Sequence, residues 1–387
     1  MDNQSMRNMI GDIFEELARG LETGAFGQRT RVGLTILGSE HGPEELVRGA
    51  ELAQQQNPDL EVVVIGHGVE TSLELIPAQD EKEAHAIMDQ MLEKQSLDAA
   101  VTMHYSFPIG VSTVGRVITP GKGKELFLAT TTGTSATERV TAMLKNTLYG
   151  IAVAKACGKE KPTVGILNID GARQVERVLK KLQEQGYPIH FAESARSDGG
   201  VVMRGNDLLL GVPDVMVMDS LTGNVLMKMF SAYMSGGSYE ALGYGYGPGV
   251  GENYDRIICI ISRASGAPVI AGAIRFAGEC AKGKLMAKAA GEFAAAKKAG
   301  LDELLNTLAC PAEVSKKAAE EVAPPPAKPV TAEIPGIEIL ELEDAVQLLW
   351  KEGIYAQSGM GCTGPIVMVA PEDKDKAVEL LKEGNYL

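Results

Sequence analysis

The stretch RVGLTILGSEHGPEELVRGAELAQQQNPDLEVVVIG, residues 31–66, decides the fold class. It predicts a buried strand at 31–38, a helix at 43–56 that begins with Pro43, and a second buried strand at 60–66. Both strands are apolar at consecutive positions, which is typical of a parallel sheet with helices on both faces. This segment therefore predicts an α/β fold, in which ligands bind at the carboxyl ends of the strands.

The same alternation of apolar runs and helical spacing continues along most of the chain. The Gly-rich segment GYGYGPGV, residues 243–250, lacks a Lys-Ser/Thr pair and does not follow a strand, so we interpret it as a mobile flap or a subunit contact. Further strands are expected at 97–103, 125–131, 163–169, 214–219, 256–262 and 267–274, and helices at 4–23, 81–94, 136–158, 172–186 and 283–300.

The composition changes near residue 320, where KKAAEEVAPPPAKPVTAEIPG favours an extended spacer. Beyond it the sequence predicts a strand at 337–342, a helix at 343–353, a strand at 364–371 and a final helix at 372–384. The 387 residues are too many for one hydrophobic core. The expected parts are a helical lead-in at 1–29, a body of two α/β subdomains at 30–318, a linker at 319–336 and a small Cys-bearing domain at 337–387.

The composition also limits the partners. With 37 Lys and Arg against 51 Asp and Glu, the formal net charge is −14, which disfavours nucleic acid and anionic lipid in the absence of a basic cluster. There is no apolar run of about 18 residues and no signal-peptide core, so we expect a cytoplasmic protein without a membrane span. The scattered cysteines predict free thiols in a reducing compartment, and no spacing suggests a metal site.

The segment SGMGCTGPIVMV, residues 358–369, contains the strongest candidate nucleophile. Cys362 lies between Gly361 and Gly364, just before an expected strand. Glycines allow backbone N–H groups to approach a small ligand closely, and such groups stabilise a thiolate or bind a carbonyl oxygen. Gly361, Thr363 and Gly364 are then expected to bind substrate. The alternative is a small buried cysteine in a tight turn, and the pattern alone favours neither.

A second candidate site lies in VMDSLTGNVLMKMF, residues 217–230. An expected strand ends at Asp219, and a turn of small polar residues precedes a helix expected to start near Val225. The N-terminus of a helix suits anion binding because its N–H groups and its dipole favour negative charge. Capping of the helix by Ser220 or Thr222 would use the same geometry. The expected phosphate- and substrate-binding residues here are Asp219, Ser220, Thr222, Gly223, Asn224 and Lys228.

A third candidate follows the first strand, where Ser39, Glu40 and His41 lie at its carboxyl end. A lone histidine is more often structural than catalytic, so only the position of His41 at the end of the strand favours a catalytic role. TTTGTSATER, residues 130–139, resembles a phosphate turn between a strand and a helix, but Thr and Ser are also common caps. The remaining cysteines lie in apolar or Ala-rich segments and are expected to be small buried side chains; they are Cys157, Cys259, Cys280 and Cys310.

Two segments together resemble the PlsX-type phosphate acyltransferases. GLTILGSEHGPEELVRGAELA looks like the first strand of that family and its Met-Gly-Gly-Asp-x-x-Pro turn, and DGGVVMRGNDLLLGVPDVMVMDSLTGNVLMKMF looks like its Asp-Gly-Phe-x-Gly-Asn-x-x-Leu-Lys region. The resemblance covers residues 30–310 and implies the two-domain fold of phosphotransacetylases and isocitrate-dehydrogenase-like enzymes, with the site in the interdomain cleft. Ser39 and Glu40 replace Gly and Asp, and Ser220 and Leu221 replace Gly and Phe. These departures put long-chain acyl-carrier substrates in doubt.

The whole chain, including the Gly-Met-Gly-Cys-Thr-Gly-Pro segment, is more similar to the alpha subunits of component C of the glycine/sarcosine/betaine reductase complex. That resemblance implies that selenoprotein A holds a carboxymethyl group on selenium, and that reductive cleavage leaves an acetyl group on a component C cysteine. Phosphate then attacks the thioester and releases acetyl phosphate. The matching cysteine is Cys362. The resemblance also implies a permanent beta subunit partner and inorganic phosphate as a substrate, and we expect no cofactor.

Three functions stay open on this basis. In the first, Cys362 carries the acyl group on a tethered domain, phosphate binds at 222–228, and Ser39, Glu40 or His41 orients phosphate or accepts its proton. In the second, the body is a PlsX-like acyl-carrier:phosphate acyltransferase and Cys362 is incidental. In the third, the chain is a docking subunit with contacts through its N-terminal helix and MKMFSAYM, residues 227–234. A nicotinamide dehydrogenase is disfavoured because no G-x-G-x-x-G follows the first strand.

Overall fold

The computed structural model describes residues 11, 13–14, 17–18, 20–21, 27, 29–197, 199–309, 322–337, 341–361, 364–384 and 386–387. The chain divides into two compact units, of which the first comprises Met1–Leu167 and Gly186–Ala299 and the second Asn168–Gln185 and Gly300–Leu387. Most of the expected lead-in helix at 4–23 lies outside the described residues, and those described between 11 and 21 are helical. No helix in the described part of the chain is long and apolar enough to cross a membrane.

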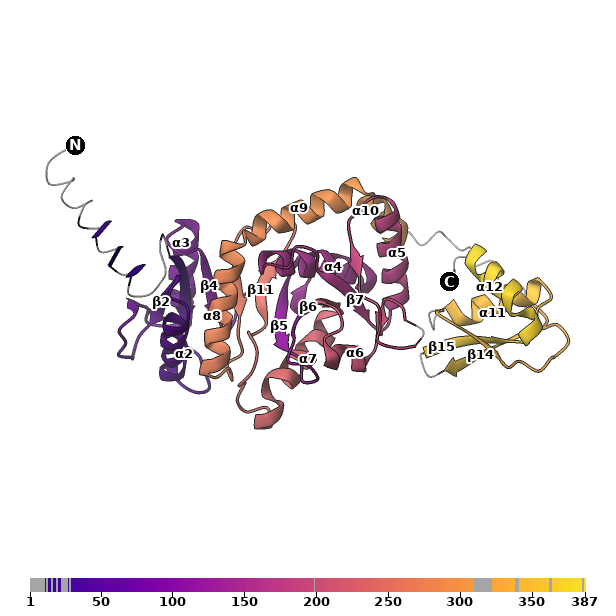
Figure 1. The fold of residues 1–387 in the computed structure, drawn as a ribbon, viewed down its shortest axis with the longest axis horizontal. Helices are drawn as coiled ribbons and strands as arrows, with labels where there is room; N and C mark the ends of the chain where they lie inside the picture. The colour runs from indigo at the N-terminus through magenta and orange to yellow at the C-terminus, as the bar shows by residue number, and fades with distance from the viewer. Residues whose placement is uncertain are drawn as a thin grey trace. The chain divides into compact units, whose positions relative to one another are not determined.

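Within its described residues, the first unit is built around one 12-stranded sheet (Figure 1). Most neighbouring strands run parallel, and the α/β fold class predicted from the sequence is confirmed. In order across the sheet the strands are β3 (Glu74–Pro77), β2 (Leu60–Gly66), β1 (Thr30–Thr35), β4 (Ala99–Thr102), β12 (Ile258–Ile260), β11 (Gly247–Val250), β5 (Val111–Ile118), β6 (Glu125–Thr134), β10 (Val215–Val217), β7 (Thr163–Leu167) and β8 (His190–Phe191), with β9 (Val202–Met203) beside β7.

The middle of this sheet is antiparallel, because β11 pairs with β12 on one side and with β5 on the other. The flap predicted at 243–250 is therefore wrong in its second half, where the Gly-rich segment forms a fully buried strand. A Cβ on Gly247 would lie 1.8 Å from the carbonyl oxygen of Val114, and one on Gly249 would lie 2.4 Å from the ring of Phe107. The glycines thus allow close packing in the sheet.

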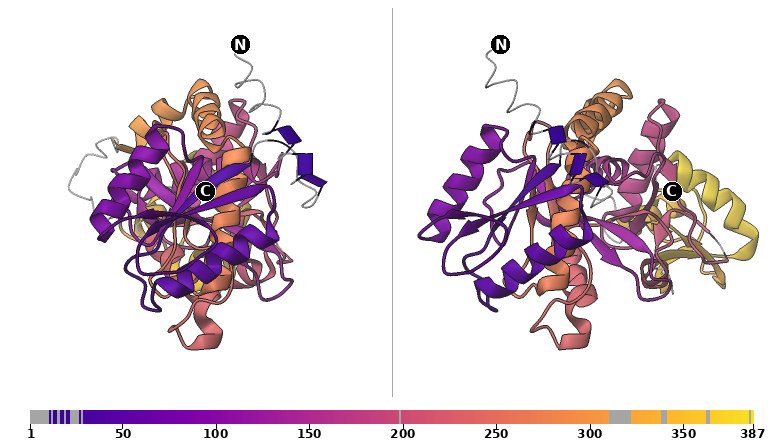
Figure 2. Two further views of the ribbon diagram at one scale, coloured as in Figure 1. Left: turned by 90° about the vertical axis from the view of Figure 1, so that its left-hand side faces the viewer. Right: turned by 60° about the vertical axis from the view of Figure 1, so that its left-hand side comes forward.

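Helices surround the strands of this unit (Figure 2). The strand predicted at 267–274 is wrong, since these residues begin helix α8 (Ala267–Lys282), which has Pro268 in its first turn. Helix α8 packs against α2 (Pro43–Gln56), β1 and β4, so apolar residues occupy most of its circumference and hide the helical period. The other helices are α3 (Glu81–Glu93), α4 (Arg139–Ala156), α6 (Gly205–Leu210), α7 (Ser220–Ala232) with the short η1 (Tyr233–Ser235), and α9 (Leu285–Lys298).

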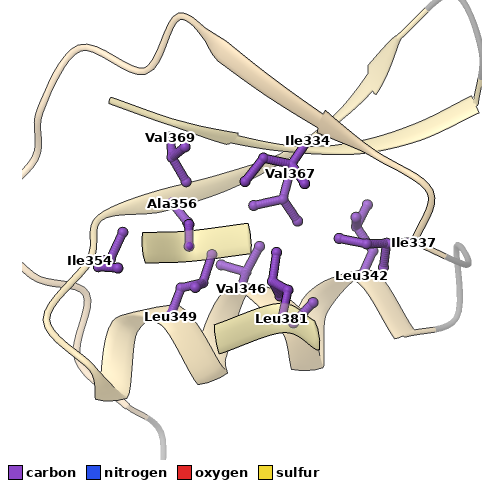
Figure 3. Packing of buried hydrophobic residues seen from close by; sticks show 12 residues of the cluster. Ile334, Ile337, Leu342, Val346, Leu349, Ile354, Ala356, Val367, Val369 and Leu381 are labelled. Atoms are coloured by element: carbon purple, nitrogen blue, oxygen red, sulfur yellow. The ribbon is translucent and has the colours of Figure 1, made fainter. Parts of the chain in front are cut away.

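The second unit contains a three-stranded antiparallel sheet in the order β13 (Ala332–Pro335), β15 (Gly364–Val369), β14 (Ala356–Gly361). Figure 3 shows side chains of its helices and of its sheet meeting in one apolar core. The strand predicted at 337–342 is wrong at its end, because Leu342 begins helix α11, and β14 was not expected. The helices of this unit are α5 (Ala172–Glu184), α10 (Leu301–Ala309), α11 (Leu342–Lys351), the short η3 (Pro371–Asp373) and α12 (Lys374–Glu383).

Candidate functional site

A cavity of about 580 Å³ opens in the first unit at the carboxyl ends of β4 and β12. Its walls come from residues 103–107 after β4, Thr132 and Gly133 near the end of β6, Tyr246 before β11, and residues 260–262. Asn224 of α7 completes the wall and is the residue of the expected phosphate set that lines it. The position agrees with the rule that ligands bind where parallel strands end in open α/β sheets.

Asp219, and not Ser220 or Thr222, caps helix α7. Its carboxylate accepts hydrogen bonds from the backbone N–H and the hydroxyl of Thr222, at 2.9 and 2.8 Å. The helix begins at Ser220, about one turn before the expected start near Val225. Both donors of Thr222 are thus bonded within the protein, and a negative charge already lies at the N-terminus of the helix.

The first turn of α7 is held tightly against the end of β6. A Cβ on Gly223 would lie 1.8 Å from the carbonyl oxygen of Thr130, so no larger residue fits without movement of the backbone. The side-chain amide of Asn224 donates to the carbonyl oxygen of Thr131 at 3.1 Å. These contacts join the weak motif at 130–139 to the stronger one at 217–230 and fix Asn224 at the cavity wall.

Lys228 lies one turn further along α7. Its ammonium group is 2.6 Å from the carboxylate of Glu240 and 3.2 Å from the hydroxyl of Ser262, which lines the cavity. The Glu240 side chain is fully buried, whereas that of Lys228 is 37% exposed. A cation is therefore fixed beside the cavity, with part of its surface open to solvent.

Ser39, Glu40 and His41 lie against the loop that follows β12. The backbone N–H of Glu40 donates to the carbonyl oxygen of Arg263 at 2.9 Å, and the hydroxyl of Ser39 lies 3.4 Å from the same oxygen. The ring of His41 lies 5.2 Å from that of Tyr239. None of the three expected residues lines the cavity, but their partner Arg263 directly follows Ser262. Their catalytic roles stay predictions.

Two parts of the site were missed by the sequence analysis. The loop Ser262–Ser265 follows a predicted strand and could have been found from its position at the carboxyl end. The other part is the polar and aromatic segment 103–107, whose Tyr105 donates a hydrogen bond to Asp89 at 2.9 Å. Burial and this bond to Asp89 raise the pKa of Tyr105, so the hydroxyl stays protonated as a donor. No sequence motif marks that segment.

The predicted Cys362 site belongs to the second unit. Strands β14 and β15 pair up to Gly361 opposite Gly364, but Cys362 and Thr363 lie outside the described residues. Cys259 and Cys280 are buried as predicted, and burial raises the pKa of both thiols, which makes them poor nucleophiles.

The two remaining cysteines of the sequence are Cys157 and Cys310. Cys157 is partly exposed, contrary to the prediction, because it follows the last residue of α4. Cys310 lies outside the described residues. Over the described ranges no group of three or more His, Cys, Asp or Glu side chains is arranged to hold a metal ion.

Comparisons with known proteins place the chain in a family. A family model described as "Fatty acid synthesis protein" matches residues 30–368. The chain is 58% identical over 384 residues to the glycine/sarcosine/betaine reductase complex component C subunit alpha of Peptoclostridium acidaminophilum, which covers 99% of both chains. It is 27% identical over 243 residues to a phosphate acyltransferase of Bacillus cytotoxicus, which covers 51% of this chain and 70% of that protein.

A solved structure of a branched-chain phosphotransacylase from Enterococcus faecalis matches with a TM-score of 0.47 and 16% identity, over 65% of this chain and 99% of that one. The family model covers all the cavity residues. The component C match covers nearly the whole chain, including most of the second unit. The chain belongs to the fatty acid synthesis protein family and, within it, to the alpha subunits of component C of glycine/sarcosine/betaine reductase complexes.

Proposed function

We propose that this chain accepts an acetyl group as a thioester on Cys362 and transfers it to inorganic phosphate, forming acetyl phosphate. It would act within a reductase complex for glycine, sarcosine or betaine, beside a component C beta subunit and a selenoprotein A that delivers the carboxymethyl group. The observation that carries the proposal is the 58% identity to a component C alpha subunit over 99% of the chain. The matches to phosphate acyltransferases support phosphate as the acceptor.

The proposed step is a simple acyl transfer. A phosphate oxygen attacks the thioester carbonyl, the new C–O bond forms, the C–S bond breaks, and the proton of hydrogen phosphate ends on the sulfur. Asn224, Lys228 and Ser262 are the proposed anion-binding groups, because Asn224 and Ser262 line the cavity and Lys228 lies beside it. Glu40 and His41 stay our candidates to relay the proton.

Intact-protein mass spectrometry after incubation with acetyl phosphate tests the proposal. The reverse reaction should add one acetyl group to the wild-type chain and none to a Cys362→Ala variant. Cys157→Ala is the matched control, since Cys157 is a partly exposed thiol in the first unit. An unmodified wild-type chain, even with its beta subunit present, would overturn the thioester proposal.

A second candidate is direct transfer from an acyl carrier to phosphate, with Cys362 incidental. The family description "Fatty acid synthesis protein" and the relatives named phosphate acyltransferase favour it. A Cys362→Ser variant separates the two functions. It would keep nearly full activity with an acyl-carrier substrate under this candidate, and would lose all acetyl phosphate formation under the first.

A docking role finds support in an exposed apolar stripe on α7 and η1. Leu221, Val225, Met229 and Tyr233 recur at four-residue steps, and each is more than half exposed. Met234 beside them is 92% exposed. We propose this stripe as a contact for the beta subunit. A Met229→Asp/Met234→Asp variant should fold normally and fail to co-purify with that subunit; unchanged co-purification would contradict the contact.

A further inference from the structure

Glu240 is a charged side chain that the sequence analysis did not select, and it lies at the centre of the groups around the cavity. Its side chain is 0% exposed, and its two oxygens are bonded to different elements. One oxygen lies 2.6 Å from the ammonium of Lys228 in α7. The other accepts a hydrogen bond of 2.6 Å from the hydroxyl of Ser265, and Tyr246 donates to the carboxylate at 3.3 Å.

The backbone of Glu240 holds the same loop. Its N–H donates to the carbonyl oxygen of Ala264, and its carbonyl oxygen accepts from Gly266, both at 2.9 Å. Ser265 in turn accepts from the backbone N–H of Ser262 at 3.0 Å. Glu240 therefore fixes both the cation and the loop that carries Ser262 and Arg263.

A buried carboxylate is costly unless its charge is paired and its oxygens are bonded. A packing role alone would be served by an apolar residue of similar size, whereas a role in positioning a cation requires the charge. Among the described residues, the Lys228 ammonium contacts Glu240 and Ser262, which leaves one of its three N–H donors for a ligand. Burial and the nearby Glu240 carboxylate raise the pKa of Tyr246, so this phenol stays a donor to Glu240.

We propose that Glu240 is a positioning residue that fixes the ammonium of Lys228 and the Ser262–Ser265 loop for binding of phosphate. The inference rests on the proposed function, in which phosphate occupies this cavity. Glu240 itself does not touch phosphate. It sets where the cation lies, and so it acts on phosphate affinity more than on the maximal rate of acyl transfer.

The chain offers a matched control for this proposal. Glu292 is also a buried carboxylate that pairs with one lysine and one tyrosine, Lys155 at 2.5 Å and Tyr187 at 2.7 Å. Neither partner lines the cavity. Glu240→Gln and Glu292→Gln therefore make the same chemical change in the same kind of environment, one beside the cavity and one away from it.

The experiment measures exchange of radiolabelled phosphate into acetyl phosphate on the full chain at varied phosphate concentrations. Glu240→Gln should raise the half-saturating phosphate concentration about tenfold and change the maximal rate much less. Glu292→Gln should leave the half-saturating concentration as in wild type. In a Lys228→Ala background, Glu240→Gln should add little, because the positioned group is gone.

An unchanged or lowered half-saturating concentration in Glu240→Gln overturns the inference while the proposed function stands. Should the wild type show no exchange, the thioester route fails, and calorimetric titration with inorganic phosphate decides the inference alone. Weaker binding by Glu240→Gln than by Glu292→Gln would then support it, and equal binding would overturn it. If Glu240→Gln fails to fold, Glu240→Asp replaces it, since this variant keeps the charge and withdraws it by one methylene.

Discussion

The cavity region of the first unit and the core of the second unit use buried space in opposite ways. Around the cavity, the fully buried carboxylate of Glu240 binds a lysine, a serine and a tyrosine. The core of the C-terminal domain is apolar, with Val346, Leu349, Val367 and Val369 packed together (Figure 3). Hydrogen bonds to a buried charge fix the positions of a few polar atoms, whereas the apolar contribution to stability is not directional. Under the proposed function, the first unit would orient phosphate and the second would carry the acyl group.

The largest effect is expected from Cys362→Ala. If the second unit carries the acyl group and the first binds phosphate, the variant should lose acetylation and phosphate exchange completely. Its affinity for inorganic phosphate, measured by calorimetry, should stay as in wild type, because the cavity residues are unaltered. A variant that still exchanges phosphate would place the carrier elsewhere.

A substitution that removes side-chain volume from the apolar core tests the second unit alone. Leu349→Ala should destabilise the C-terminal domain by about 2–5 kcal/mol, since Leu349 is fully buried. Trp350 is the one tryptophan of the sequence, and its indole N–H donates to Ala356 within the same domain. Tryptophan fluorescence therefore reports unfolding of this domain, and far-ultraviolet circular dichroism is dominated by the first unit. A fluorescence transition that does not move would contradict the packing.

The cation beside the cavity is tested by Lys228→Ala. Loss of a hydrogen bond to a charged group, about 1.5–3 kcal/mol, should raise the half-saturating phosphate concentration by roughly ten- to a hundredfold. Lys155→Ala is the control, because it leaves the buried Glu292 unpaired in the same way. Equal loss of phosphate affinity in both variants would mean that general destabilisation, and not the site, explains the effect.

The smallest expected effect is a difference in acid sensitivity. Burial lowers the pKa of His85, whose imidazole lies 2.9 Å from the hydroxyl of Thr102. Its neutral form therefore stabilises the fold above the unfolded pKa of about 6.5, and this contribution is lost as the pH falls through the lower folded pKa.

All five histidines lie between His41 and His190, so the fluorescence transition of Trp350 should not share the histidine titration. His85→Gln should flatten the loss of stability of the first unit as the pH falls below about 6.5. The measurement is thermal unfolding at several pH values, and an unaltered pH profile in the variant would contradict the assignment.

The sequence correctly predicted the elements in which apolar residues recur at a clear helical or strand spacing. The helix at 43–56 and the strand at 60–66 were predicted at their exact bounds, because one has a clear apolar face and the other a clear apolar run. Helix α8 was mistaken for a strand, because burial of most of its circumference removed the period. The Gly-rich β11 was mistaken for a flap, because its glycines serve close packing that only the fold reveals.

Prediction of the site had the same limit, because a local sequence pattern does not show which distant segments meet in the fold. Asn224 and Lys228 were proposed because a motif contains them; Asn224 lines the cavity and Lys228 lies beside it, and their role in binding stays a prediction. Glu240 was not selected, because a single glutamate in a loop carries no local signal and its partners come from three other segments, α7, Tyr246 and residues 264–266. The structure adds that the carboxylate of Asp219, a predicted binding residue, caps helix α7 through Thr222. Hydrogen-bond accounting needs coordinates, since residue type does not show which donors are already bonded.

The position of β12 in the sheet has a consequence for synthesis of the chain. The strands β1 to β4 are complete when about the first hundred residues have left the ribosome, but β4 finds its other neighbour only in residues 258–260. Helix α8, whose Ile270 packs against Gly49, emerges later still. At roughly 5–20 residues per second, the early strands stay uncovered for about ten to thirty seconds, with an open edge and an apolar face. The nascent chain is thus most prone to aggregation, and most in need of a chaperone, before its last third has been translated.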